Sequence, residues 1–92
     1  MKTHDQHLHI LRLYEIYCYR VCYYLLQNEV LASESSKTTL MELFRHENFF
    51  QSSESERKRI IHKIATKHSL QTYYDSLPHK ERENGVTSIL SR

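Results

Sequence analysis

One glycine and one proline in 92 residues limit what this chain folds into more than any other feature of its sequence. All-β folds need turn residues about every eight to twelve positions, and this sequence lacks them. Hydrophobic residues make up 39% of the chain, which is enough for the core of one small domain. We therefore predict an all-α protein, a small three- to four-helix bundle over residues 1–76, with a short C-terminal helix or tail over 77–92.

The first predicted helix runs from about Thr3 to about Asn28 and contains the tyrosine-rich stretch LYEIYCYRVCYYLL. Apolar and aromatic residues recur along this helix at the helical period. The tyrosines on the apolar stripe are expected to be mostly buried, namely Tyr14, Tyr17 and Tyr24. The other two lie on a different face and are expected to be more exposed, namely Tyr19 and Tyr23.

Two further helices are predicted. The stretch LASESS is interpreted as a break, followed by a second helix over about 33–47. The stretch NFFQSS is interpreted as a loop. Ser53 and Glu56 then form a capping-box pattern ahead of a third helix that continues to about Tyr74.

Cys18 and Cys22 lie four residues apart on one helix face, which is poor geometry for a mutual disulfide. The N-terminal residues lack the apolar stretch of a signal peptide, and no apolar run reaches the roughly eighteen residues of a membrane span. We therefore predict a cytoplasmic protein with two reduced, half-buried thiols and no membrane association.

Residues 57–67 contain basic side chains and no acidic one, and they carry the clearest chemical signal: Arg57, Lys58, Arg59, Lys63 and Lys67. Arg59, Lys63 and Lys67 are spaced i, i+4, i+8, so they stack on one helix face about 6 Å apart. Such a row suits a polyanion backbone, whose counterions it displaces. The alternative is an ordinary solvated helix face.

Phe49 and Phe50 come just before this basic helix. Single-stranded bases stack on aromatic rings beside cations, at about 1–3 kcal/mol per base. The alternative is that both rings plug the end of a small core.

Metal and catalytic motifs are lacking. The seven histidines and two cysteines form no CxxC or HxxxH pattern, and there is no glycine-rich phosphate loop or nucleophile elbow. We predict no metal, no cofactor and no enzymatic activity.

Three segments follow one another in order: LYEIYCYRVCYYLL, ASESSKTTLMELFRH and ERKRIIHKIATKHSLQTYY. Together they resemble region 2 of bacterial sigma factors of the extracytoplasmic-function class, over residues 10–75. The matching positions are Leu13, Tyr14, Glu15, Tyr17, Arg20 and Val21 in the first segment, Ala32, Met41, Leu43, Phe44 and Arg45 in the second, and Ile61, Lys63, Ile64, Ala65 and Leu70 in the third.

The resemblance implies a helical domain whose second helix binds the clamp helices of RNA polymerase. It assigns that contact to Glu34, Lys37, Thr38, Met41, Glu42 and Arg45. It assigns contact with the melted −10 promoter strand to Phe49, Phe50, Arg59, Lys63 and Lys67. Arg57 and Lys58 belong to the same basic segment and complete the predicted DNA-binding set.

We therefore predict a stand-alone sigma-region-2-like module that acts in transcription initiation. It would bind core RNA polymerase and single-stranded or melted −10 DNA as part of a split sigma factor, with a partner protein carrying the −35-binding domain. Ser36, Lys37 and Thr38 stand where the family has Val-Gln-Glu. This departure leaves a second hypothesis open, a degenerate sigma-like protein that acts as a protein-binding regulator or adaptor without DNA binding. A third is a helical bundle with no nucleic-acid role.

Overall fold

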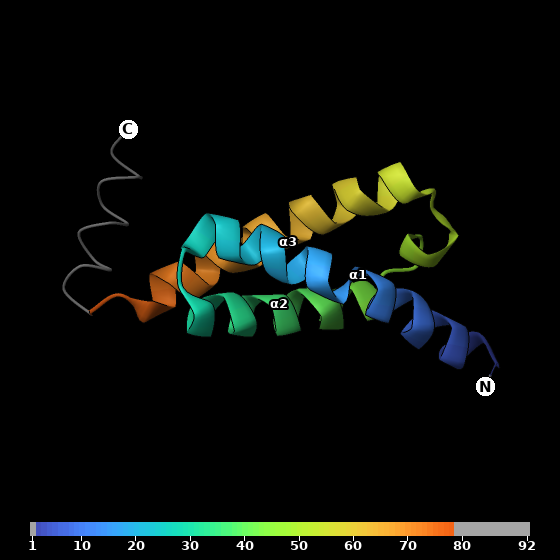
Figure 1. Ribbon diagram of the computed structural model, residues 1–92, viewed down its shortest axis with the longest axis horizontal. Coiled ribbons are helices and arrows are strands. Elements are labelled where there is room, and N and C mark those ends of the chain that lie inside the picture. Colours follow the sequence, from blue (N-terminus) through green and yellow to red (C-terminus); the bar gives the residue numbers. More distant parts are fainter. Residues whose placement is uncertain (1, 79–92) are drawn as a thin grey trace.

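The computed structural model describes residues 2–78, which form three α-helices and one short 3-10 helix (Figure 1). The elements are α1 (Lys2–Leu26), α2 (Glu29–Phe44), η1 (Phe49–Gln51) and α3 (Glu54–Ser76). Short connections make α2 antiparallel to both neighbours, so that α1 and α3 run parallel. The predicted small all-α bundle is confirmed, while most of the expected C-terminal helix or tail lies in 79–92, outside the described residues.

The joint between α1 and α2 consists of two residues. Gln27 has a φ of 52°, in the left-handed region that ends helices, and its side-chain Nε2 donates to the Tyr24 carbonyl at 3.0 Å. Asn28 caps α2, because its Oδ1 accepts a hydrogen bond from the Leu31 amide at 2.9 Å. The predicted break at LASESS is therefore wrong, since α2 begins at Glu29 and runs through those serines.

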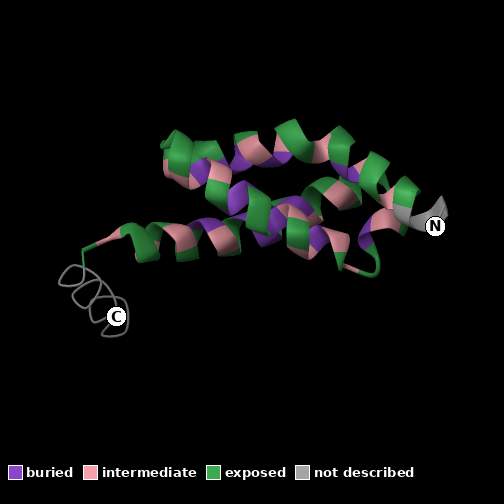
Figure 2. Cartoon of the chain, turned by 90° about the horizontal axis from the view of Figure 1, so that it is seen from below, coloured by how far each residue is buried: buried purple, intermediate pink, exposed green. Residues whose placement is uncertain are grey.

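Small buried residues lie where all three helices meet, and Figure 2 shows buried residues on the helices of the bundle. We call this set the small-residue seam, and its members are Cys18, Cys22, Ala32, Ser35, Ser36, Ala65 and Ser69. Their size lets the helix backbones approach closely. Ser35 and Ser36, predicted to belong to a break, are buried because they face α1 and α3.

Hydrogen bonds satisfy the polar atoms of the seam. The hydroxyls of Ser35 and Ser69 are 2.9 Å apart and join α2 to α3, and Thr39 Oγ1 donates to the Ser35 carbonyl at 2.8 Å. A hydrogen bond with Cys22, together with burial, raises the pKa of the Cys18 thiol, which therefore stays protonated. Both thiols are free and fully buried rather than half-buried as predicted.

A larger apolar cluster forms at the end of the bundle where α1 begins. Its buried members are Leu11, Cys18, Leu43, Phe49, Ile61 and Ile64. The ring of Tyr14 contacts Phe49 edge-on, with ring centroids 5.9 Å apart. α3 enters this cluster after the Ser53 cap, whose Oγ accepts from the Glu56 amide at 3.2 Å, so the predicted start of the third helix is confirmed.

The tyrosines of α1 divide differently from the prediction. Tyr14 and Tyr17 are half-buried, but Tyr24 is 78% exposed, so the expectation that it is mostly buried is wrong. Val21 and Ala65 belong to one buried cluster, whereas Tyr24 lines an open hollow between α1 and α3. Tyr23 is exposed as predicted, and the ring of half-buried Tyr19 stacks on it at 6.1 Å.

Two leucines that differ in burial test this core. Leu43 is fully buried and Leu70 is 66% exposed. Leu43→Ala is expected to lower the free energy of unfolding by about 2–5 kcal/mol, because apolar burial is removed and a cavity is left behind. Leu70→Ala is the control and should change it by less than about 0.5 kcal/mol. Urea unfolding followed by circular dichroism measures both, and equal losses would contradict this account of the core.

Candidate functional site

The outer face of α2 presents most of the residues predicted to bind polymerase. Ser35, Thr39 and Leu43 turn the opposite face of the helix into the bundle. The exposed residues on the outer face are Glu34, Lys37, Thr38, Met41 and Arg45. Met41 lies in the middle of this strip and is 59% exposed. α2 therefore brings these five predicted residues together on one accessible surface.

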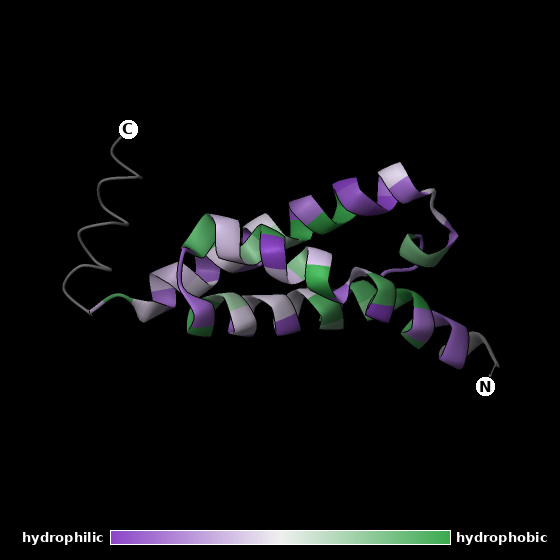
Figure 3. Cartoon of the chain, in the orientation of Figure 1, coloured by the Kyte–Doolittle hydropathy of each residue, from purple (hydrophilic) through white to green (hydrophobic). Residues whose placement is uncertain are grey.

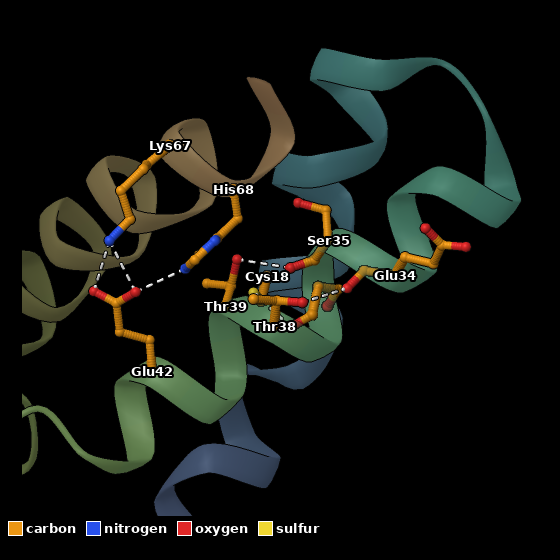
Figure 4. Close-up of polar contacts among 9 residues, drawn as sticks. Cys18, Glu34, Ser35, Thr38, Thr39, Glu42, Lys67 and His68 are labelled. Atoms are coloured by element: carbon orange, nitrogen blue, oxygen red, sulfur yellow. Dashed lines mark hydrogen bonds and ion pairs between the residues drawn. The ribbon is translucent and has the colours of Figure 1, made fainter. Parts of the chain in front are cut away.

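Glu42 is the exception, because it turns toward α3 (Figure 4). Its carboxylate accepts two hydrogen bonds from Lys67 Nζ, at 2.9 and 3.0 Å, and lies 2.7 Å from His68 Nε2. These contacts hold the pKa of Glu42 below its ordinary value. The structure thus pairs a residue predicted to face polymerase with one predicted to face DNA.

The loop before α3 places its two phenylalanines against the bundle. The Phe49 ring is fully buried in the apolar cluster, so it is not placed to stack on a base. The Phe50 ring is half-buried and stacks on His7, with centroids 3.9 Å apart and planes 6° from parallel. For Phe49, the placement corresponds to the alternative interpretation of a ring that plugs the core.

Arg57 holds this loop in place. Its Nε donates to the Phe49 carbonyl at 3.1 Å and its Nη2 donates to the Phe50 carbonyl at 2.6 Å. Its guanidinium also lies over the Tyr14 and Phe49 rings, at 5.9 and 5.8 Å from their centroids. These contacts direct the Arg57 side chain toward the protein rather than toward a phosphate in solvent.

Besides Lys67, which pairs with Glu42, three predicted DNA-binding cations are exposed on α3, and Figure 3 shows hydrophilic residues along this half of the helix. They are Lys58, Arg59 and Lys63. Lys58 lies 3.6 Å from Glu54, and Arg59 lies 3.6 Å from Glu56. Exposed pairs of this kind are worth about 1 kcal/mol or less, so they leave the cations available to an anion.

Three histidines make contacts that the sequence did not assign. His7 stacks on Phe50, His68 contacts Glu42, and His62 Nε2 lies 2.7 Å from the Tyr17 hydroxyl. His68 follows Ile64 by four residues and so lies on the inward stripe of α3, which is the one sequence signal for its contact with α2.

The Glu42 contacts predict a pH-dependent contribution to stability. Because Lys67 and His68 hold the pKa of Glu42 below its ordinary value of 4.5, its carboxylate stabilises the fold above that pH. This stability is lost as the pH falls through the lower pKa of the folded state. Glu42→Gln should reduce the free energy of unfolding by up to about 1 kcal/mol near pH 7 and by a smaller amount near pH 3.

Urea unfolding at the two pH values measures this effect. Glu47→Gln is the matched control, since Glu47 is exposed and close in sequence. A Glu42→Gln deficit of equal size near pH 3 would contradict the electrostatic explanation.

Comparison of the chain with protein-family models, curated proteins and solved structures finds no match in any of the three. Within residues 2–78, no helix is long and apolar enough to cross a membrane. The same part of the chain contains no group of three or more His, Cys, Asp or Glu side chains arranged to hold a metal ion.

Proposed function

We propose that the chain is a stand-alone module similar to region 2 of sigma factors, which acts in transcription initiation by binding core RNA polymerase through the outer face of α2. One observation supports this most strongly: the predicted polymerase-binding residues other than Glu42 are exposed together on that face. Met41 supplies an adaptable apolar contact at its centre, and Lys37 and Arg45 supply charge on the same face.

In the same proposal, Lys58, Arg59 and Lys63 contact the phosphates of the melted −10 strand. Their exposure on one stretch of α3 supports this role. Among the described residues, no accessible pair of aromatic rings lies beside them, so the contact gives affinity rather than base readout. A partner protein carrying the −35-binding domain would supply the rest of promoter recognition.

A second candidate function is a protein-binding regulator or adaptor that does not contact DNA. The internal use of three predicted DNA-binding residues favours it: Phe49 is buried, Arg57 binds loop carbonyls and Lys67 binds Glu42. This candidate keeps the α2 surface as a docking site. The two functions therefore differ in the role of α3.

Polymerase binding is tested by placing a charge in the centre of the α2 face. Met41→Asp should reduce the core RNA polymerase recovered with tagged protein by about tenfold or more, because a charge in a docked apolar contact costs well over about 1.4 kcal/mol. Leu13→Asp is the matched control, because Leu13 is exposed to a similar degree on α1. Failure of the unaltered protein to recover polymerase, alone or with candidate partners, would overturn the proposal.

DNA binding is tested by reversing one charge on α3. Lys63→Glu should weaken binding to labelled single-stranded −10 DNA. It should also make the negative slope of log affinity against log salt shallower by about 0.7, because one phosphate is no longer neutralised. Lys37→Glu makes the same charge change on α2 and should leave the slope unchanged. Fluorescence anisotropy at several salt concentrations measures both, and absence of binding at low salt would favour the regulator.

A further inference from the structure

A groove runs between α1 and α3, on a side of the bundle away from the α2 face. Two adjoining hollows of about 420 and 200 Å³ form it, and they are continuous because both are lined by Leu25 and Thr66. We call this feature the α1/α3 groove, and its principal walls are Val21, Tyr24, Leu25, Thr66, Leu70 and Tyr73. None of these residues belongs to the surfaces described above.

Large apolar side chains stand exposed along this groove. Tyr24 is 78% exposed, Leu70 is 66% exposed and Tyr73 is 52% exposed. Figure 3 shows hydrophobic segments on the last turns of α1, beside α3. Single exposed apolar residues are ordinary, but a contiguous set that lines a concave surface is typical of a protein–protein contact.

The dimensions of the groove suit a helix. Its α1 wall extends from Tyr17 to Leu25, or about 12 Å, and its α3 wall extends from His62 to Tyr73, or about 16 Å, at the helical rise. About three turns of a helix from a partner fit over that length. Such a helix would present anchors at i, i+3 or i+4, and i+7, which is the usual pattern of a helix bound in a groove.

The charges at the groove have one sign. Arg20 lines it, Lys63 follows the groove residue His62 along α3, and among the described residues no acidic side chain lines either hollow. A second copy docked by the same face would bring these basic groups together, because a two-fold contact pairs each patch with itself. The complementary occupant instead carries carboxylates beside its apolar anchors.

We propose that the α1/α3 groove binds an acidic amphipathic helix of a partner protein. The apolar side of that helix packs on Tyr24, Leu25, Leu70 and Tyr73. Its flanking carboxylates pair with Arg20 on α1 and with Lys63 on α3. This interaction goes beyond the proposed polymerase contact, because it uses a different face of the bundle.

The test uses the full chain and a fluorescein-labelled synthetic helix of about fourteen residues, long enough for the groove. Its leucines follow the i, i+3, i+4, i+7 pattern and glutamates flank them, and a second peptide has lysine at every glutamate position. Fluorescence anisotropy should show the acidic peptide binding at least about tenfold more tightly than the basic one.

Two variants, each with a matched control, locate the binding. Leu70→Ser should weaken binding of the acidic peptide about tenfold while Met41→Ser leaves it unchanged, since both side chains are similarly exposed. Arg20→Glu should weaken it while Arg45→Glu does not. Circular dichroism must show an unchanged fold in all four variants. Leu70→Ser should also leave recovery of core polymerase intact, which separates this inference from the proposed function.

Several results would overturn the inference. These are no binding of the acidic peptide, equal binding of both peptides, or an equal decrease in the control variants. A dimer in sedimentation equilibrium that Leu70→Ser converts to a monomer would assign the groove to a second copy. Leu90→Ser in the full chain tests whether the chain's own C-terminal segment occupies the groove. A tenfold gain in peptide affinity in this variant would mean that the segment competes with the peptide, and would make that segment the occupant.

Discussion

The hydrogen bond between Ser35 and Ser69 in the small-residue seam is the interaction on which the arrangement of the three helices depends. Each hydroxyl is buried, and a buried hydroxyl without a partner costs about 1–3 kcal/mol in proteins. A rotation of α2 or α3 that separates the two oxygens therefore carries that penalty. Cys18 and Cys22 complete the seam from α1 and are small enough for the other two helices to approach.

The rotation set by the seam determines which side chains reach solvent. With Ser35 and Thr39 inward, Met41 points outward on α2. With Ile61 and Ile64 inward, Arg59 and Lys63 are exposed on α3. Side chains at the edges of the helix turn back to neighbouring elements, and the Lys58 ammonium lies over the Tyr17 ring of α1, 5.4 Å from its centroid. Arg57 turns toward the loop and Lys67 toward α2. The bundle thus separates cations that support its own structure from cations available for binding.

Local patterns predicted the helical class and the start of α3, because the Ser53 cap and the isoleucine periodicity both involve residues close in sequence. The start of α2 was missed because serines suggest a break, whereas Asn28 as the cap was the better signal. The contacts of the candidate site could not be predicted. Glu42 and Lys67 are 25 residues apart, and their pairing depends on how α2 and α3 pack, which spacing along the chain does not specify.

The Glu42–Lys67 ion pair also has a consequence for thermodynamic linkage between the two helices that carry it. A ligand that takes the Glu42 carboxylate leaves the Lys67 ammonium without this partner, on the helix that carries Arg59 and Lys63. An anion bound to Lys67 likewise leaves the Glu42 carboxylate without its partner. By reciprocity, each ligand changes the binding free energy of the other by the same amount. Because the pair is partly exposed, the coupling is limited to about 1 kcal/mol, or about fivefold in either affinity.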